Sequence, residues 1–456
     1  MQPQLPSGLS SQALIARLER LPVTAWHVRA RIIVGAATFF DAFDVQAISV
    51  VLPVLAVEWR LSPSEIGFLI STGFVGQLAG ALLFGWIGER FGRLRALTYS
   101  VAGLALMSLA CATAWNYTAL FVFRTIQGVA IGGEVPVAAT YISELSTAHG
   151  RGRFFLLYEM LFSIGLAAAG LVGYWLVPRI GWQPMFILGA LPALLALVLR
   201  RLLPESPRWL ASQGRLVEAN RVVGQMEEYA LRHGARLAPV HPVITATANP
   251  SATRWTELFS KTYLRRTLTV WIIWFTCYFV AYGLTAWMPT LYRTVFKLDV
   301  AAALRLSLAI NLAGLSGDLL VAFTIDRLGR RVWFTIAFAL ASLPLLALWF
   351  LGAASAHLVA LCASLSYVFV ASNALACYLY TPEIYPTRIR AIGTSIATAW
   401  LRAGSAAGPV LVGFMLTRFN LSAVFLSFAL VSLVGSVAAG VFAIETRERV
   451  LEEISP

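Results

Sequence analysis

Long apolar stretches recur along the whole chain, and each is about as long as a helix that crosses a lipid bilayer. Of the 456 residues, 59% are hydrophobic and 12% are charged, whereas roughly 25% of residues are charged in soluble domains. A helix of roughly 20 apolar residues crosses a hydrocarbon layer about 30 Å thick. The sequence therefore predicts an all-α polytopic membrane protein.

Hydropathy predicts twelve transmembrane helices in two groups of six. The first group covers 32–57, 67–88, 96–114, 119–142, 154–176 and 183–200, and the second covers 267–292, 302–324, 332–351, 357–381, 391–416 and 421–444. We expect an N-terminal six-helix bundle at 32–200 and a C-terminal one at 267–444. Outside them, we expect a cytoplasmic N-terminal segment (1–31), a cytoplasmic linker with short helices (201–266) and a cytoplasmic tail (445–456).

The net charge of +13 is interpreted as an orientation signal. Most of the 35 Lys and Arg residues lie in the termini and in loops on the same side of the predicted membrane. Those in the opposite loops are Arg60, Arg179, Arg293, Lys297 and Arg418. Because Lys and Arg favour the cytoplasmic side, both termini are predicted to be cytoplasmic. No nucleic-acid partner is expected.

Two motifs repeat between the halves at nearly the same spacing. The acid, Arg, Gly and Arg of Glu89-Arg90-Phe91-Gly92-Arg93 return in Asp326-Arg327-Leu328-Gly329-Arg330, 237 residues later. Tyr141-Ile142-Ser143-Glu144 returns as Tyr380-Thr381-Pro382-Glu383, 239 residues later. Two motifs in register indicate duplication of a six-helix unit, a layout typical of secondary transporters.

These motifs resemble those of the major facilitator superfamily. Residues 85–93 are similar to its loop signature between helices two and three, and Arg124 to Glu144 resembles the fourth-helix pattern of its sugar porters and organic ion transporters. Residues 204–210 and 380–390 are similar to segments that those branches carry after helices six and ten. The resemblance implies two pseudo-symmetric bundles and transport by alternating access.

A few charged residues fall deep inside predicted spans, where a charge costs at least about 3 kcal/mol and is usually functional. Asp41 and Asp44 lie roughly 14–18 Å into the first span, three residues apart and so on one face. In proton-coupled sugar porters, the resemblance implies, the acid matching Asp44 pairs with the arginine matching Arg124. We predict that Asp44 and Arg124 couple protons to transport, with Asp41 and Glu134 as further candidates; the alternative is a structural acid pair.

Arg402 is the principal candidate for binding substrate. It lies near mid-depth in span eleven, and residues 402–409 are similar to a segment of organic anion transporters. A guanidinium in a dry cavity can hold a carboxylate by two parallel hydrogen bonds. The alternative is that Arg402 permanently neutralises Asp41 or Asp44.

Further side chains are predicted to surround the substrate. Aromatic rings stack on flat ligands, and mid-span amides supply orienting hydrogen bonds. The candidates are Tyr278, Trp274, Tyr367, Asn373, Gln46 and Asn311.

Charges at the cytoplasmic ends of the spans are predicted to form a gate that joins the two halves when the cavity opens outward. They are Glu89, Arg90, Arg93, Glu144, Arg151, Asp326, Arg327, Arg330, Glu383 and Arg390.

The sequence contains no pattern for nucleotide binding, nucleophilic catalysis or metal ligation, so we expect neither an enzyme nor a cofactor or metal. We predict a monomeric bacterial inner-membrane symporter that imports a small aromatic carboxylate with protons. Nicotinate (niacin) is the first expectation, because the pattern resembles bacterial vitamin B3 transporters. Hydroxybenzoate-type acids, organic cations and sugars are the alternatives, and a non-transporting sensor is the rival of another class.

Overall fold

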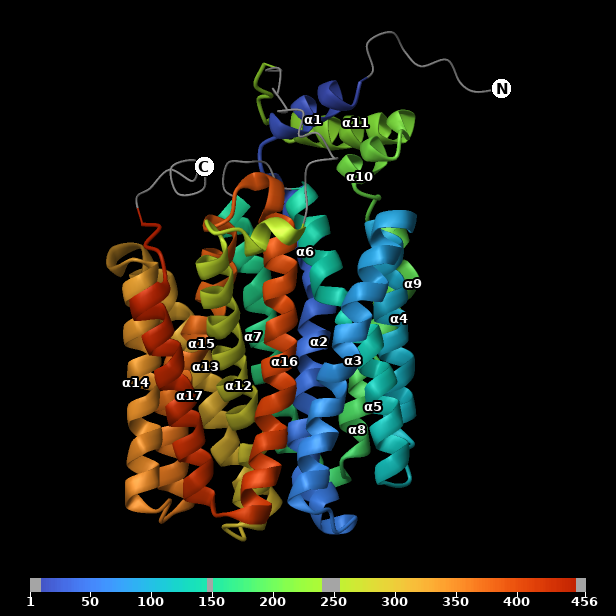
Figure 1. Cartoon of the computed structure of the whole chain (residues 1–456). Helices are drawn as coiled ribbons and strands as arrows, with labels where there is room; N and C mark the ends of the chain where they lie inside the picture. The colour runs from blue at the N-terminus through green and yellow to red at the C-terminus, as the bar shows by residue number, and fades with distance from the viewer. Residues whose placement is uncertain (1–9, 146–150, 240–254, 448–456) are drawn as a thin grey trace.

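The computed structural model describes residues 10–145, 151–239 and 255–447, and in that part of the chain the regular elements are helices (Figure 1). Within the described ranges, eleven helical segments are long and apolar enough to span a membrane, with Tyr117–Leu145 counted as one segment. The prediction of an all-α polytopic membrane protein is confirmed.

The N-terminal bundle contains the blue-to-green helices of Figure 1. Its elements are α2 (Ala25–Glu58), α3 (Pro63–Phe91), α4 (Arg93–Ala112), α5 (Tyr117–Gly132), α6 (Glu134–Leu145), α7 (Arg151–Ile180), α8 (Gln183–Gly189) and α9 (Pro192–Leu202). The C-terminal bundle, yellow to red, contains α12 (Leu264–Thr294), α13 (Val300–Leu328), α14 (Arg330–Leu351), α15 (Ala356–Glu383), α16 (Thr387–Arg418) and α17 (Leu421–Phe442).

Capping side chains and glycines set the ends of several membrane helices. The side chains of Ser62, Asn116 and Ser355 accept hydrogen bonds from the first turns of α3, α5 and α15, where four N–H groups lack intrahelical partners. On the cytoplasmic side, Gly92 separates α3 from α4 at φ 111° and Gly329 separates α13 from α14 at φ 87°. Because only glycine adopts positive φ freely, the same turn explains why glycine occurs at both positions.

Two predicted spans are each made of two helices. The fourth ends as α5 at Gly132 and resumes as α6 at Glu134, and the sixth is divided into α8 and α9. Pro136 and Pro192 each follow the break within a few residues, and proline has no N–H to donate to the carbonyl four residues earlier. The predicted span 119–142 falls within the candidate membrane span Tyr117–Leu145, and both 119–142 and 183–200 contain a break between two helices.

The two halves meet mainly through the contacts of α3 with α16, α7 with α13 and α2 with α12. At the outer end, a Cβ added at Gly67 would lie 2.7 Å from the carbonyl oxygen of Pro409, and one added at Gly413 would lie 2.5 Å from that of Pro63. Backbones this close leave no space between α3 and α16. The interface is thus closed at its outer end.

Short helices cover the cytoplasmic end of the N-terminal bundle, namely α1 (Ser11–Glu19), α10 (Pro207–Ser212) and α11 (Leu216–Arg232) (Figure 1). The 3-10 helix η2 (Trp255–Phe259) precedes α12. Glu227 of α11 accepts hydrogen bonds from Arg17 at 2.5 Å and Arg20 at 2.6 Å. Burial raises the pKa of Glu227, but these two bonds outweigh burial and hold the pKa below its usual value.

Candidate functional site

A buried ion pair lies in the middle of the N-terminal bundle. Arg124 Nη1 of α5 is 2.6 Å from Asp44 Oδ2 of α2, and both side chains are almost fully buried. A buried charge is tolerated only when it is paired and hydrogen-bonded. The structure thus places Asp44 and Arg124 in the contact that the family resemblance implies.

Gln127 completes this ion pair, and the sequence interpretation missed it. Its Nε2 donates to Asp44 Oδ1 at 2.7 Å, and its Oε1 accepts from Arg124 Nη1 at 2.7 Å. Ser108 of α4 also donates to Asp44 Oδ1, at 3.3 Å. Its spacing could have identified it, because a residue three positions after Arg124 lies on the same helix face.

A cavity of about 10 Å³ adjoins Arg124 between α2, α3 and α5. A space of roughly 10–15 Å³ is the minimum for one water molecule. Its lining residues are Val45, Ile48, Ile70, Gly73, Phe74, Gln77 and Arg124.

Arg402 of α16 crosses the interface between the halves. Its Nη1 donates to Gln77 Oε1 of α3 at 2.6 Å, and its Nη2 donates to the Gly132 carbonyl of α5 at 3.3 Å. Only 9% of the residue is exposed. Asp44 pairs with Arg124 instead, and among the described residues no carboxylate forms an ion pair with Arg402.

Three aromatic rings follow one another along α12. Trp274 and Tyr278 are stacked with centroids 5.7 Å apart, and Tyr278 is stacked on Tyr282 at 6.1 Å. Tyr282 meets Phe74 of the other half at 4.6 Å and lies within electrostatic range of both Asp41 and Arg402. Trp274 is fully buried behind Tyr278, with its indole N–H donated to Thr381 at 2.8 Å.

The other predicted acids occupy separate places near the interface. Asp41 is 3% exposed on α2 and lies within electrostatic range of Tyr282. Glu134, in the first turn of α6, accepts a hydrogen bond from Thr38 at 2.8 Å, and Thr38 is 2.6 Å from the hydroxyl of Tyr158. Glu134 therefore lies next to the helix break that Arg402 contacts.

Three buried amides and a tyrosine were also predicted to bind substrate. Within the described residues, Asn373 has no hydrogen-bond partner at either amide atom, and the Nδ2 of Asn311 and the Nε2 of Gln46 have none either. Tyr367 lies against Gly314, where an added Cβ would be 2.7 Å from its ring. Buried polar atoms are normally hydrogen-bonded, so these unpaired amide atoms are unusual.

The predicted gate charges form ion pairs inside each half. Arg93 contacts Glu89 at 3.2 Å and Glu144 at 3.1 Å. The equivalent Arg330 contacts Asp326 at 2.9 Å and Glu383 at 3.1 Å. These contacts differ from the predicted bond between the halves, because in this conformation each arginine reaches the acids of its own bundle.

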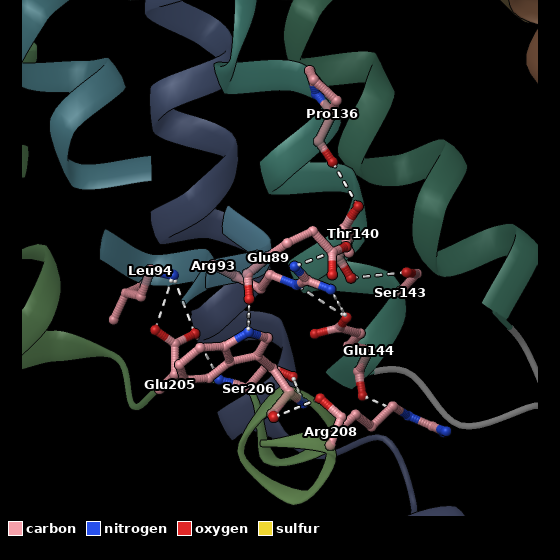
Figure 2. A network of polar contacts seen from close by, with 12 residues as sticks. Glu89, Arg93, Leu94, Pro136, Thr140, Ser143, Glu144, Glu205, Ser206 and Arg208 are labelled. Carbon is pink, nitrogen blue, oxygen red and sulfur yellow. Dashed lines mark hydrogen bonds and ion pairs between the residues drawn. The ribbon is translucent and has the colours of Figure 1, made fainter. Parts of the chain in front are cut away.

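The contacts of Arg93 and Glu144 are part of a larger polar network that includes the segment before α10, as Figure 2 shows. Glu205 accepts the backbone N–H groups of Leu94 and Ser206, and Arg208 donates to the Glu144 carbonyl at 3.0 Å (Figure 2). Burial raises the pKa of Glu205, although the backbone N–H groups oppose that rise.

The remaining predicted gate residues are placed differently. The Arg90 guanidinium lies 5.8 Å from the ring centroid of Trp86. Arg327 accepts a hydrogen bond from Arg447 at its carbonyl, and Arg390 donates to the carbonyl of Tyr385 at 3.3 Å. The side chain of Arg151 lies outside the part of the chain that the structure describes.

Comparison with known proteins gives consistent matches over most of the chain. The family model described as "Sugar (and other) transporter" matches residues 34–456. The niacin transporter NiaP of Acinetobacter baylyi is 34% identical over 97% of this chain and 99% of its own length. The gallate transporter of Pseudomonas putida is 30% identical over 88% of each chain.

Among solved structures, the chain is similar to the xylose transporter XylE from E. coli in a partially occluded inward open conformation. The TM-score is 0.75 at 19% sequence identity, covering 94% of this chain and 100% of that one. At 19% identity, this similarity is evidence for a shared fold.

Proposed function

The chain belongs to the sugar (and other) transporter family of the major facilitator superfamily, and on that premise we propose that it imports a small aromatic carboxylate together with protons. It is a multi-pass membrane protein and a transporter, not an enzyme. We place it, as a monomer, in a bacterial inner membrane with its basic ends in the cytoplasm.

The single observation that carries the proposal is the environment of Arg402. The guanidinium is buried at the interface of the halves, its two hydrogen-bond acceptors among the described residues are uncharged, and Tyr282 lies within electrostatic range of it. A charged acceptor binds a buried guanidinium more strongly than a neutral amide does. A flat carboxylate would therefore place its charge on Arg402 and its ring along Tyr278 and Tyr282.

The relatives' names favour the same class of solute. One is a niacin transporter and another is a gallate transporter, and both names denote small aromatic acids. Nicotinate is our first candidate because the niacin transporter matches at the higher identity and over nearly the whole chain. Gallate-like hydroxybenzoates are the second candidate, favoured by the similarity to the gallate transporter.

Proton coupling is proposed to act through Asp44. Its carboxylate accepts hydrogen bonds from Arg124 and Gln127 of α5 and from Ser108 of α4. Protonation removes the negative charge that holds α2 to Arg124 and thereby changes the relative free energy of the conformations. Asp41 and Glu134 are secondary candidates for a further proton.

Binding of two nearly isosteric ligands to purified protein tests the role of Arg402. Nicotinate and nicotinamide share the ring, but only nicotinate carries a carboxylate. We expect the protein to prefer nicotinate at least about tenfold, and Arg402→Ala to remove that preference. Arg418→Ala is the matched control, because Arg418 is an exposed arginine at the C-terminal end of the same helix, away from Arg402.

Two outcomes would change the proposal. An unchanged preference in Arg402→Ala would contradict the carboxylate role. Binding of hydroxybenzoates in place of nicotinate, with the same dependence on Arg402, would keep that role and move the substrate to the second candidate.

A further inference from the structure

The amide of Gln77 occupies the position on Arg402 where a carboxylate would bind. Gln77 Oε1 is 2.6 Å from Nη1, and the Gly132 carbonyl is 3.3 Å from Nη2. An end-on carboxylate would use these same two terminal nitrogens. Gln77 and Gly132 therefore reproduce, with two neutral oxygens, the fork that a substrate carboxylate offers.

The Gly132 carbonyl is available because of the break in the fourth span. In a continuous helix it would accept the backbone N–H of residue 136, but residue 136 is proline and has no N–H. The Arg402 guanidinium supplies the donor in its place. This second acceptor belongs to the backbone, so Gln77 is the only one of the two that substitution can remove cleanly.

Gln77 also lies next to the proton-coupling pair. It lines the same small cavity as Arg124, and an added Cβ at Gly73, one turn away on α3, would lie 3.3 Å from Arg124 Nη2. The side chain thus lies between the arginine of the proposed proton pair and the arginine of the proposed substrate site.

We propose that Gln77 is an internal competitor of the substrate, which holds Arg402 in the empty transporter and releases it when a carboxylate binds. This proposal rests on the proposed function of Arg402. The apparent affinity for substrate is then reduced by the fraction of molecules in which Gln77 occupies the guanidinium. The choice of a neutral amide matters, because an acid at residue 77 would compete too strongly and a hydrocarbon would not compete at all.

Release of Gln77 also affects the contact between the halves. The Arg402–Gln77 bond joins α16 to α3, and the Ser71–Ala406 bond at 2.6 Å joins the same two helices nearer their outer ends. Substrate binding would replace a bond between the halves with a bond to the solute. Gln77 is therefore a positioning residue that links substrate affinity to the separation of the halves.

The test measures nicotinate dissociation constants for two variants with opposite expected effects. Gln77→Leu removes the competing oxygen and is expected to tighten binding by about threefold. Gln77→Glu supplies a permanent internal carboxylate and is expected to weaken binding by at least about tenfold. Ser71→Ala is the matched control, because it removes a different α3–α16 hydrogen bond and should leave the constant within about twofold.

The two proposals can fail separately. If Arg402→Ala abolishes nicotinate binding but Gln77→Leu and Gln77→Glu change the constant in the same direction, the competitor role is overturned and the proposed function stands. If nicotinate binds equally to the unchanged protein and to Arg402→Ala, the proposed function is overturned, and the competitor role with it. Should Gln77→Leu not fold, wild-type affinity in folded Gln77→Glu overturns the competitor role by itself.

Discussion

At the scale of single residues, the proposed mechanism depends on two buried arginines with different partners. Arg124 has a carboxylate at 2.6 Å, whereas Arg402 has an amide at 2.6 Å and a carbonyl at 3.3 Å. The first arrangement is a closed internal pair that a proton can disrupt. The second leaves a buried cation whose acceptors among the described residues are neutral, which is the arrangement that we propose for binding an anion.

Asp44→Asn imitates a permanently protonated acid, because an amide keeps the shape of the carboxyl group but not its charge. We expect this variant to lose uphill accumulation of substrate and to keep exchange of labelled for unlabelled substrate across liposomes. Both activities are measured with the same labelled acid. Asp299→Asn is the control, since Asp299 is an exposed N-cap and asparagine caps a helix equally well. Accumulation at the wild-type level by Asp44→Asn would exclude Asp44 as the coupling residue.

The sequence predicted the main charged residues of the candidate site but not their polar partners. Asp44, Arg124 and Arg402 stand out because charges are rare in apolar spans. Gln77 and Gln127 do not, because an uncharged amide among apolar residues gives the same sequence pattern whether it faces lipid, a neighbouring helix or a ligand. Their roles depend on distances between helices, which a single sequence does not contain.

At the scale of elements, close packing of α3 on α5 sets the position of Arg124. A Cβ added at Gly128 would lie 2.1 Å from the carbonyl oxygen of Gly73, and one added at Gly132 would lie 2.3 Å from that of Gln77. Small residues allow membrane helices to approach this closely. The same contact brings Gln77 and the Gly132 carbonyl together, so that one guanidinium reaches both.

Gly128→Ala is expected to lower the melting temperature of the purified protein. The added methyl group would contact backbone, which moves less readily than a side chain, and overpacking of this kind costs about 1–3 kcal/mol. Gly85→Ala is the matched control in α3, because an added Cβ there has nothing within 4 Å and alanine favours helix. Equal melting temperatures for the two variants would contradict the packing argument.

Hydropathy located the membrane helices well but missed their interruptions. The predicted spans 302–324 and 391–416 fall inside α13 (Val300–Leu328) and α16 (Thr387–Arg418), because helices continue past the hydrocarbon into the polar interface. The breaks at Gly133 and before Pro192 were missed, because hydropathy counts apolar atoms and not missing hydrogen-bond donors. Pro136 was the residue that indicated the first break. Because it has no N–H, the Gly132 carbonyl lacks its helical donor and accepts from Arg402 instead.

At the scale of the whole molecule, the structure describes a state closed on the outer side. Backbone contacts join α3 to α16 from Pro63 and Gly413 inward, whereas the cytoplasmic arginines Arg93 and Arg330 pair within their own halves. Composition and the internal repeat could predict two bundles and their orientation. They could not predict which end is closed, because one sequence encodes both conformations with similar free energies.

Nicotinate uptake into liposomes that contain the purified protein tests the account most directly. With an acidic outside, we expect labelled nicotinate to accumulate above its external concentration, and a proton ionophore to abolish the accumulation. Liposomes with Arg402→Ala, measured beside them, should not accumulate it. Uptake that stops at equal concentrations whatever the proton gradient, or equal accumulation with Arg402→Ala, would contradict a proton-driven carboxylate importer.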